Sequence, residues 1–299
     1  MAQQLKQFLL YLTVEKNASP YTVTSYSADV ESFFEFAKRQ GVSEALFANT
    51  NQMIVRAYLG ELKTHGYARS TIARRIASLR SFFRFLVCKN LITNNPVSGI
   101  YAPKFEMRPS VSLNNKEIKE LLGLPGSDLL GQRDAAILEL LYASGIRISE
   151  LVDLTTNDID LVNQYLLLYG SEFRKRVVPI GRPAVDAVEQ YLEQTRPRLY
   201  RHHMGLSHDK IFVNKNGGPL TDRSVRRLIM KYVNCLAVSK EISPQSIRYT
   251  FATHLLENGA NVSSVKEMLG QANLSSKMFD NNDQNERLRS VYKHAHPRA

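Results

Sequence analysis

Cysteine is scarce in this chain, because Cys88 and Cys235 are the only two among 299 residues. Two cysteines cannot build a disulfide framework or a cysteine-rich zinc site. Each lies within an apolar helical pattern, which predicts a buried and unreactive thiol. We therefore expect neither a fold stapled by disulfide bonds nor a structural zinc site.

Long apolar runs are absent as well. No stretch approaches the roughly 20 residues that a membrane-spanning helix needs. A signal peptide requires a clean apolar region, and residues 1–16 are interrupted by glutamine and lysine. We therefore expect a cytoplasmic protein that has no membrane partner.

Acidic residues are too few to balance the basic ones. The chain has 28 Asp and Glu against 39 Lys and Arg, which gives a formal net charge of +11. Much of this excess lies in the first 110 residues. A basic excess of this size favours a polyanionic partner, and double-stranded DNA is the first candidate.

Two segments fall short of known ligand loops. Residues 280–286 are rich in Asp and Asn, but the run lacks the glycine at its sixth position and the glutamate at its twelfth that a calcium loop requires. The glycine pair at 217–218 lacks the spacing and the following lysine of a phosphate loop. We expect no metal and no cofactor.

The first hundred residues predict a helical domain. Apolar residues recur at helical spacing from Leu5 to Leu12, and Ser19 before Pro20 is a typical helix start that leads into a second helix ending at Arg39. Further helices are indicated from about 50 to 65 and from Ser70 to about 94. Residues 1–100 therefore form the first expected domain.

A linker and a second domain follow. Residues 101–112 contain two prolines and no helical periodicity, which is typical of a linker. Asn114 and Glu117 have the spacing of a capping box that opens the domain 113–299. Two apolar runs, 165–169 and 175–180, flank a short polar turn and predict a β-hairpin among helices. The expected fold class is mainly α, with two domains and a small antiparallel sheet.

The fourth predicted helix is strongly basic. It has no acidic residue between 68 and 87, and its arginines flank the apolar stripe. Guanidinium groups donate paired hydrogen bonds to phosphate oxygens, so this helix is a candidate DNA-contacting element. The arginines are Arg69, Arg74, Arg75, Arg80 and Arg84.

The last sixty residues contain a spaced polar pattern. Gln245 lies three residues before Arg248, Gln271 follows twenty-three residues after Arg248, and Asp280 follows nine residues after that. An earlier segment, residues 143–151, reads Ala-Ser-Gly-Ile-Arg-Ile-Ser-Glu-Leu and contains Arg147. Together these segments resemble the catalytic domain of the tyrosine recombinase (phage-integrase) family, of the bacterial Xer type.

The resemblance covers nearly the whole chain. The Ser-Pro-Tyr-Thr segment at 19–22 and the basic run at 72–86 are similar to the core-binding domain of the family, a four-helix SAM-like domain. The resemblance implies two domains that surround duplex DNA. It also implies that Arg147 and Arg248 clamp the phosphate, and that the residues from Val291 to Ala299 form a tail docking onto a neighbouring subunit.

Four positions depart from the family pattern. The family has histidine where this chain has Gln245 and Gln271, lysine where it has Ser171, and the nucleophilic tyrosine where it has Asp280. Glutamine does not transfer protons near neutral pH, and strand cleavage needs an activated nucleophile and an acid for the leaving group. The sequence therefore predicts a DNA-binding recombinase relative that cannot cleave, as a regulator or a silent partner in a recombination complex.

The alternative is an active recombinase with a non-standard nucleophile. Arg174 and Lys175 follow Ser171 closely and are further candidates for DNA contact, and Lys175 could replace the missing lysine if the turn were remodelled. Tyr249 and Tyr292 are phenols near the family boxes, and both are interpreted as packing residues. Ser275 and Ser276 have no visible general base, and His254 is interpreted as structural.

Overall fold

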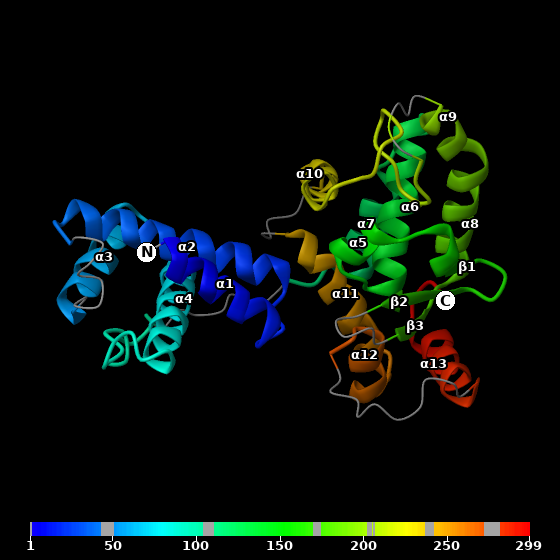
Figure 1. The fold of residues 1–299 in the computed structure, drawn as a ribbon. Helices are drawn as coiled ribbons and strands as arrows, with labels where there is room; N and C mark the ends of the chain where they lie inside the picture. Colours follow the sequence, from blue (N-terminus) through cyan, green and yellow to red (C-terminus); the bar gives the residue numbers. More distant parts are fainter. Residues whose placement is uncertain are drawn as a thin grey trace. The chain divides into compact units, whose positions relative to one another are not determined.

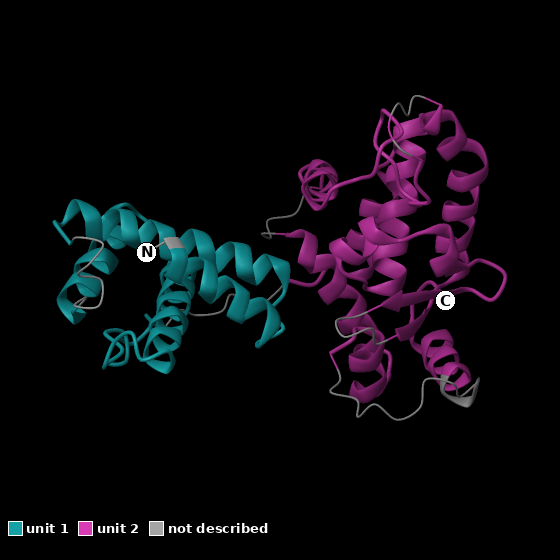
Figure 2. Ribbon diagram, viewed as in Figure 1, with its two compact units in different colours: residues 1–108 teal, residues 109–299 magenta. Residues whose placement is uncertain are grey.

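The computed structural model describes residues 2–42, 51–103, 111–169, 175–201, 205, 207–236, 242–271 and 282–299. These residues belong to two compact units, Met1–Arg108 and Pro109–Ala299, which are coloured separately in Figure 2. The division falls within the segment 101–112 that the sequence indicates as a linker. Each unit is described by itself below.

Among the residues that the structure describes, the first unit contains four helices, as expected from the sequence (Figure 1). Ser19 caps the second helix by accepting a hydrogen bond from the backbone N–H of Thr22 at 3.2 Å. The fourth helix begins one residue earlier than expected and has no side-chain cap. The four helices are α1 (Ala2–Val14), α2 (Pro20–Arg39), α3 (Gln52–Thr64) and α4 (Arg69–Cys88).

An aromatic cluster holds this unit together. Phe33 and Phe83 are fully buried and meet edge to face with ring centroids 5.9 Å apart. Phe8 of α1 contacts Phe82 of α4 in the same way at 5.2 Å. Edge-to-face pairs add to the stabilisation that burial of the rings provides, so the apolar stripes predicted from periodicity are the faces that meet.

In its described residues, the second unit is mostly helical and contains one sheet. Asn114 and Glu117 form the predicted capping box: the Asn114 side chain accepts from the Glu117 N–H, and Glu117 accepts from the Asn114 N–H at 2.7 Å. The helices are α5 (Asn115–Gly123), α6 (Leu129–Ser144), α7 (Ile148–Asp153), α8 (Arg182–Gln190), α9 (Arg196–Tyr200), α10 (Asp222–Val233), α11 (Pro244–Glu257), α12 (Val262–Met268) and α13 (Asn282–Ala295). A π-helical segment, Tyr191–Thr195, lies between α8 and α9.

The sheet is antiparallel and has the order β1-β2-β3. Strands β2 (Tyr165–Tyr169) and β3 (Lys175–Pro179) form the predicted hairpin, with Leu167 opposite Val177. Strand β1 (Ile159–Asp160) pairs with β2 and was not expected, because two residues carry no periodic signal. The hairpin turn lies outside the described residues.

Helix α6 is the central element of the second unit (Figure 1). It packs against α8 and α11 and is buried along most of its length. It ends at Gly145, whose φ of 58° is left-handed. A Cβ there would lie 2.3 Å from the Phe251 ring, so only glycine allows both this turn and the close contact with α11.

The expectation that both cysteines are buried was wrong. Cys88 and Cys235 are both exposed free thiols. Cys88 is the last residue of α4, and Cys235 lies two residues after the end of α10. Apolar periodicity weakens as a predictor of burial at helix ends, because the final turn has fewer neighbours.

Candidate functional site

Arg147 stands at the junction between α6 and α7, where its backbone N–H donates to Glu150 Oε2 at 2.7 Å. Its Nη1 donates to Glu150 Oε1 at 3.1 Å. The side chain remains 48% exposed. Glu150 therefore orients the guanidinium group while leaving it accessible to a ligand.

Glu150 has a second partner, Arg176 of β3. Arg176 Nη1 lies 2.8 Å from Oε1, and Nη2 donates to Oε2 at 2.8 Å. Burial acts to raise the pKa of Glu150, but the hydrogen bonds and charges of Arg176 and Arg147 outweigh it and hold the pKa below its usual value. The carboxylate is therefore ionised at neutral pH.

Arg176 was missed by the sequence reasoning. Besides Glu150, it donates from Nε to the carbonyl of Met268 at 3.0 Å, so it connects β3, α7 and the end of α12. Its side chain is only 10% exposed. Strand alternation was the available signal, because Arg176 is opposite Leu168, which is buried.

Arg248 of α11 approaches the same group. Nη1 donates to the carbonyl of Gly145, and Nη2 donates to the carbonyl of Leu269 at 2.6 Å. Burial, followed by the charge of Arg147, lowers the pKa of Arg248 to about 10. Arg248 is still a cation at neutral pH, and its charge interacts with those of Arg147 and Arg176.

The geometry therefore joins Arg147 and Arg248 as the sequence indicates. Arg147 and Arg176 bond to the Glu150 carboxylate, whereas Arg248 is bound to backbone carbonyls and interacts with the other three charges without a direct bond to them. We call Arg147, Arg176, Arg248 and Glu150 the arginine clamp. Its excess positive charge and exposed Arg147 suit an anion with several oxygens, such as a phosphate diester.

Gln245 and Gln271 both lie next to this clamp along the chain and are exposed. Gln245 precedes Arg248 by three residues on α11, a spacing that puts both on one face of the helix. Gln271 follows the turn whose Leu269 carbonyl accepts from Arg248. Both side chains carry amide N–H donors.

Three predicted site residues lie outside the described residues: Ser171, Arg174 and Asp280. Lys175 is described, and its ammonium nitrogen lies 5.6 Å from the centroid of the Tyr169 ring on β2. Ser275 and Ser276 are outside the described residues as well.

The two phenols considered as substitute nucleophiles differ in accessibility. Tyr249 is 44% exposed, so the prediction that it packs within the helix was wrong. Tyr292 is 2% exposed and stacks on His296 with centroids 4.7 Å apart, as expected of a packing residue. Burial raises the pKa of Tyr292 far above its usual value, which disfavours a phenolate there.

His254 is buried, and its Nδ1 lies 2.9 Å from the hydroxyl oxygen of Tyr142. This bond joins α11 to α6 away from solvent. His254 thus has the structural setting that the sequence predicts.

The C-terminal tail lies against its own unit in this structure. Arg298 pairs with Glu139 of α6 at 2.7 Å, and the Asn258 side chain donates to the carbonyl of Ala295 at 2.8 Å. Burial lowers the pKa of His296 to about 3, so it is neutral. These contacts hold the tail against α6 and the end of α11 of its own unit.

The basic helix of the first unit is less available than its sequence indicates. Arg74 and Arg75 both pair with Asp29 of α2, an acid that the sequence window around α4 does not contain. Arg75 also donates to Tyr58 at 2.6 Å, and Arg80 donates to the carbonyl of Ile100. Arg69 and Arg84 are exposed.

A second basic surface lies on α10 and was also missed. Arg223, Arg226 and Arg227 are exposed and follow each other at helical i, i+3 and i+4 spacing, with Lys231 one turn later. Asp222 lies 4.0 Å from Arg226 and compensates part of this charge. The spacing of these arginines was the signal available in the sequence.

Among the described residues there is no cluster of His, Cys, Asp or Glu suited to a metal ion. Of the helices that the structure describes, none has the length and apolar character needed to cross a membrane.

Comparison with known proteins gives consistent results. The chain matches the Phage integrase family over residues 112–285 and the Phage integrase N-terminal SAM-like domain over residues 5–90. It is 40% identical to "Tyrosine recombinase XerC" of Pelotomaculum thermopropionicum, covering 100% of this chain and 99% of that protein. It is 37% identical to "Tyrosine recombinase XerD" of Halalkalibacterium halodurans, covering 99% and 98%.

Solved structures share the fold. A lambda integrase dimer bound to a core site gives a TM-score of 0.67 at 19% identity, over 94% of this chain and 98% of that one. The XerH recombinase bound to its difH substrate gives 0.65 at 21% identity, over 96% and 84%. The two matched domains, together with the full-length identity to Xer recombinases, lead to one conclusion: this chain belongs to the phage integrase family, as a tyrosine recombinase of the Xer type.

Proposed function

We propose that this chain is a Xer-type subunit that binds duplex DNA and holds a backbone phosphate without cutting the strand. One observation carries the proposal. Arg147 and Arg248 are both present in the arginine clamp, while glutamine occupies positions 245 and 271, where the family has histidines that transfer protons.

The clamp fits a phosphate that sits against Arg147. The open face of Arg147 can donate paired hydrogen bonds to two phosphate oxygens. Arg248 has two carbonyl acceptors already, so it adds charge and its remaining N–H groups. Gln245 and Gln271 can donate amide hydrogens to the same anion.

Strand cleavage needs groups that this chain replaces. The attacking atom must be activated, and the leaving 5′ oxygen must receive a proton. Glutamine supplies neither step at neutral pH. Asp280 stands at the nucleophile position, where its negative charge opposes a phosphate and its side chain is shorter than a phenol. Attack by its carboxylate would give a labile acyl phosphate.

Contacts to the rest of the duplex are proposed for both units. The exposed cations of α10, together with Arg69 and Arg84 of α4, can meet backbone phosphates and position the protein. Residues 1–100 and 113–299 would then act as two DNA-binding domains joined by residues 101–112.

A second subunit is the proposed protein partner. The related lambda integrase and XerH structures contain a DNA-bound dimer and a substrate complex, respectively. A subunit that binds but does not cut would act as a silent partner of an active recombinase or as a regulator of recombination. The C-terminal tail, once released from Glu139, is the proposed contact with that partner.

The test scores binding and cleavage separately on intact and nicked duplexes. We expect binding that weakens steeply with salt, since phosphate contacts release counterions, and no new strand ends. Arg248→Gln is the matched variant, because it removes one clamp charge and keeps a hydrogen-bonding side chain. Strand breakage by the unaltered chain would overturn the proposal.

The alternative is an active recombinase that uses Tyr249. This residue directly follows Arg248 in the chain and is 44% exposed, so its phenol is accessible to solvent. A covalent adduct with DNA that disappears in Tyr249→Phe would establish this alternative. An adduct that survives the substitution would place the nucleophile elsewhere.

A further inference from the structure

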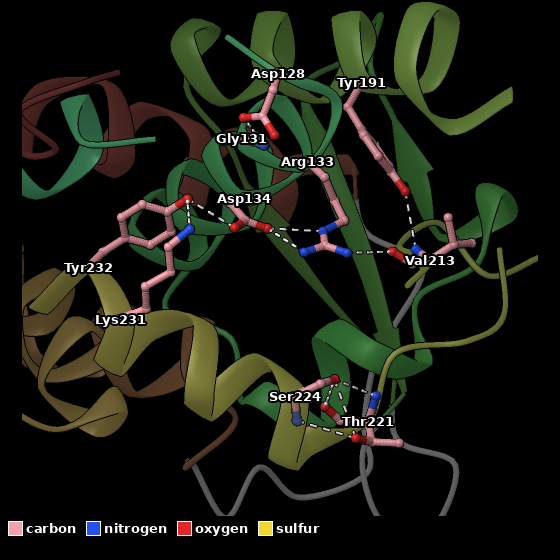
Figure 3. Close-up of polar contacts among 10 residues, drawn as sticks. All are labelled: Asp128, Gly131, Arg133, Asp134, Tyr191, Val213, Thr221, Ser224, Lys231 and Tyr232. Carbon is pink, nitrogen blue, oxygen red and sulfur yellow. Dashed lines mark hydrogen bonds and ion pairs between the residues drawn. The ribbon is translucent and has the colours of Figure 1, made fainter. Parts of the chain in front are cut away.

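A buried ion pair lies at the start of α6, away from the arginine clamp. Arg133 and Asp134 are 9% and 3% exposed. Arg133 Nε and Nη2 donate to Asp134 Oδ1 at 3.0 and 2.7 Å (Figure 3). The two residues are neighbours on one helix, so this bond alone connects nothing distant.

Each member of the pair has a second partner that leads to α10. Asp134 Oδ2 accepts from the hydroxyl of Tyr232, in the last turn of α10, at 2.9 Å. Arg133 Nη1 donates to the carbonyl of Val213 at 3.2 Å. Val213 lies in the segment 207–221 that enters α10, so the pair fixes both the approach to this helix and its far end.

The approach segment is held on its other side by the π-helical segment. The Tyr191 hydroxyl donates to the carbonyl of Ile211 at 3.1 Å and accepts from the N–H of Val213 at 3.1 Å. Thr221 then caps α10 by accepting from the N–H of Ser224 at 3.2 Å. Figure 3 shows Arg133 and Tyr191 both contacting the backbone of Val213, with the Thr221–Ser224 cap drawn apart from them.

Tyr232 also contacts one of the exposed cations of α10. The Lys231 ammonium lies 4.6 Å from the centroid of the Tyr232 ring and donates to its hydroxyl at 3.3 Å. A change in the position of Tyr232 would therefore move this cation directly. The other exposed cations, Arg223, Arg226 and Arg227, would follow as parts of the same helix.

Helix α6 connects this network to the arginine clamp. Asp134 lies in its second turn, and Gly145 at its end accepts from Arg248. At 1.5 Å per residue, the helix separates the two points by about 16 Å. A buried ion pair is weak support for stability, because its desolvation offsets its attraction. A geometric role explains its presence better than a gain in stability does.

We propose that Arg133, Asp134 and Tyr232 form a positioning network that sets the exposed cations of α10 at a fixed separation from the arginine clamp, so that both engage one DNA duplex. This inference rests on the proposed DNA binding. The residues of the network are positioning residues and touch no DNA themselves.

The test is a double-mutant cycle on duplex affinity. Tyr232→Phe removes only the hydroxyl and should weaken binding about tenfold, which corresponds to about 1.4 kcal/mol. In a background carrying Arg223→Gln, Arg226→Gln and Arg227→Gln, the same substitution should change affinity by less than about twofold, because most of the charges that it misplaces are gone.

Tyr142→Phe is the matched control. It also removes a buried hydroxyl from a hydrogen bond, in this case with His254, and it leaves α10 untouched. Its effect on affinity should be equal in both backgrounds. Thermal unfolding of every variant shows whether a loss of affinity comes from a loss of stability or from displaced cations of α10. Asp134→Asn replaces Tyr232→Phe if the Tyr232→Phe variant does not fold.

Equal fold-changes for Tyr232→Phe in the two backgrounds would overturn the network while leaving DNA binding in place. Absence of duplex binding by the unaltered chain would overturn the proposed function and the network together. A reduced salt slope for Tyr232→Phe alone, without a change for Tyr142→Phe, would support the network independently.

Discussion

Arg147 of the clamp and Arg75 of α4 differ in how much of the guanidinium group their partners leave exposed. In the clamp, Glu150 and backbone carbonyls orient the guanidinium groups, and Arg147 keeps 48% of its side chain exposed. In α4, Arg75 is surrounded by Asp29, Ser32, Tyr58 and Tyr67 and is only 12% exposed. The comparison teaches that a run of basic residues in the sequence indicates local charge. Whether each guanidinium group is free to bind a ligand depends on its partners from other helices.

The largest expected effect tests the structural role of the α4 arginines. Asp29 is 2% exposed and compensates both Arg74 and Arg75. Asp29→Ala leaves a nearly buried cation without its acid and should lower the free energy of unfolding by about 3 kcal/mol. Urea denaturation measures this change.

The matched control is Glu61→Ala, which breaks the surface pair with Arg39, whose side chain is 63% exposed. Such a pair contributes about 0–1 kcal/mol. If the two variants are equally stable, α4 does not use its arginines structurally, and the contrast between the two regions fails.

Next in size is the loss of clamp charge. Arg248→Gln should weaken duplex binding by a factor of about 10 to 100, since a hydrogen bond to a charged group contributes about 1.5–3 kcal/mol. Arg75→Gln should lower stability with a smaller effect on affinity measured below the unfolding transition. Fluorescence anisotropy with a labelled duplex distinguishes them, and the reverse order of affinities would contradict the account.

A smaller effect concerns the acid dependence of stability. The folded-state pKa of Glu150 lies below its usual value of 4.5, so its ion pairs stabilise the fold above that pH, and this contribution is lost as the pH falls through the folded-state pKa. Glu150→Gln should therefore lose less stability between pH 7 and pH 3 than the unaltered chain. Urea midpoints at the two pH values test this, and identical losses would show that the pair contributes nothing.

The smallest expected effect distinguishes an exposed arginine of α4 from one that is hydrogen-bonded within the protein. Arg84 is exposed, whereas Arg80 donates to the carbonyl of Ile100. Arg84→Gln should reduce the slope of log affinity against log salt by about 1, the value for one phosphate contact. Arg80→Gln should leave the slope unchanged, and a larger change for Arg80 would reverse the assignment.

Much of the fold was predictable because its signals are local. Apolar periodicity, the Ser19 cap and the Asn114–Glu117 box indicated elements that the structure contains. The two-residue strand β1 and the exposure of the cysteines depend on contacts outside any sequence window. Of the clamp arginines, Arg147 and Arg248 were found through the spacing of family boxes, since no local property distinguishes Arg248 from other arginines.

Arg176 and the Asp134–Tyr232 bond could not be found in this way. Arg176 belongs to the clamp only because β3 lies beside α7 and α12. Tyr232 is separated from Asp134 by 98 positions, and their contact depends on how α10 packs. The partners of the α4 arginines could not be predicted from the sequence for the same reason, since Asp29 lies on another helix.

The most direct measurement counts strand ends covalently joined to protein after incubation with a nicked duplex that traps a cleavage intermediate. The positive control is a variant that restores the family residues through Asp280→Tyr, Gln245→His, Gln271→His and Ser171→Lys. The account predicts adducts for this variant and duplex binding without adducts for the unaltered chain. A covalent protein–DNA adduct formed by the unaltered chain would contradict it.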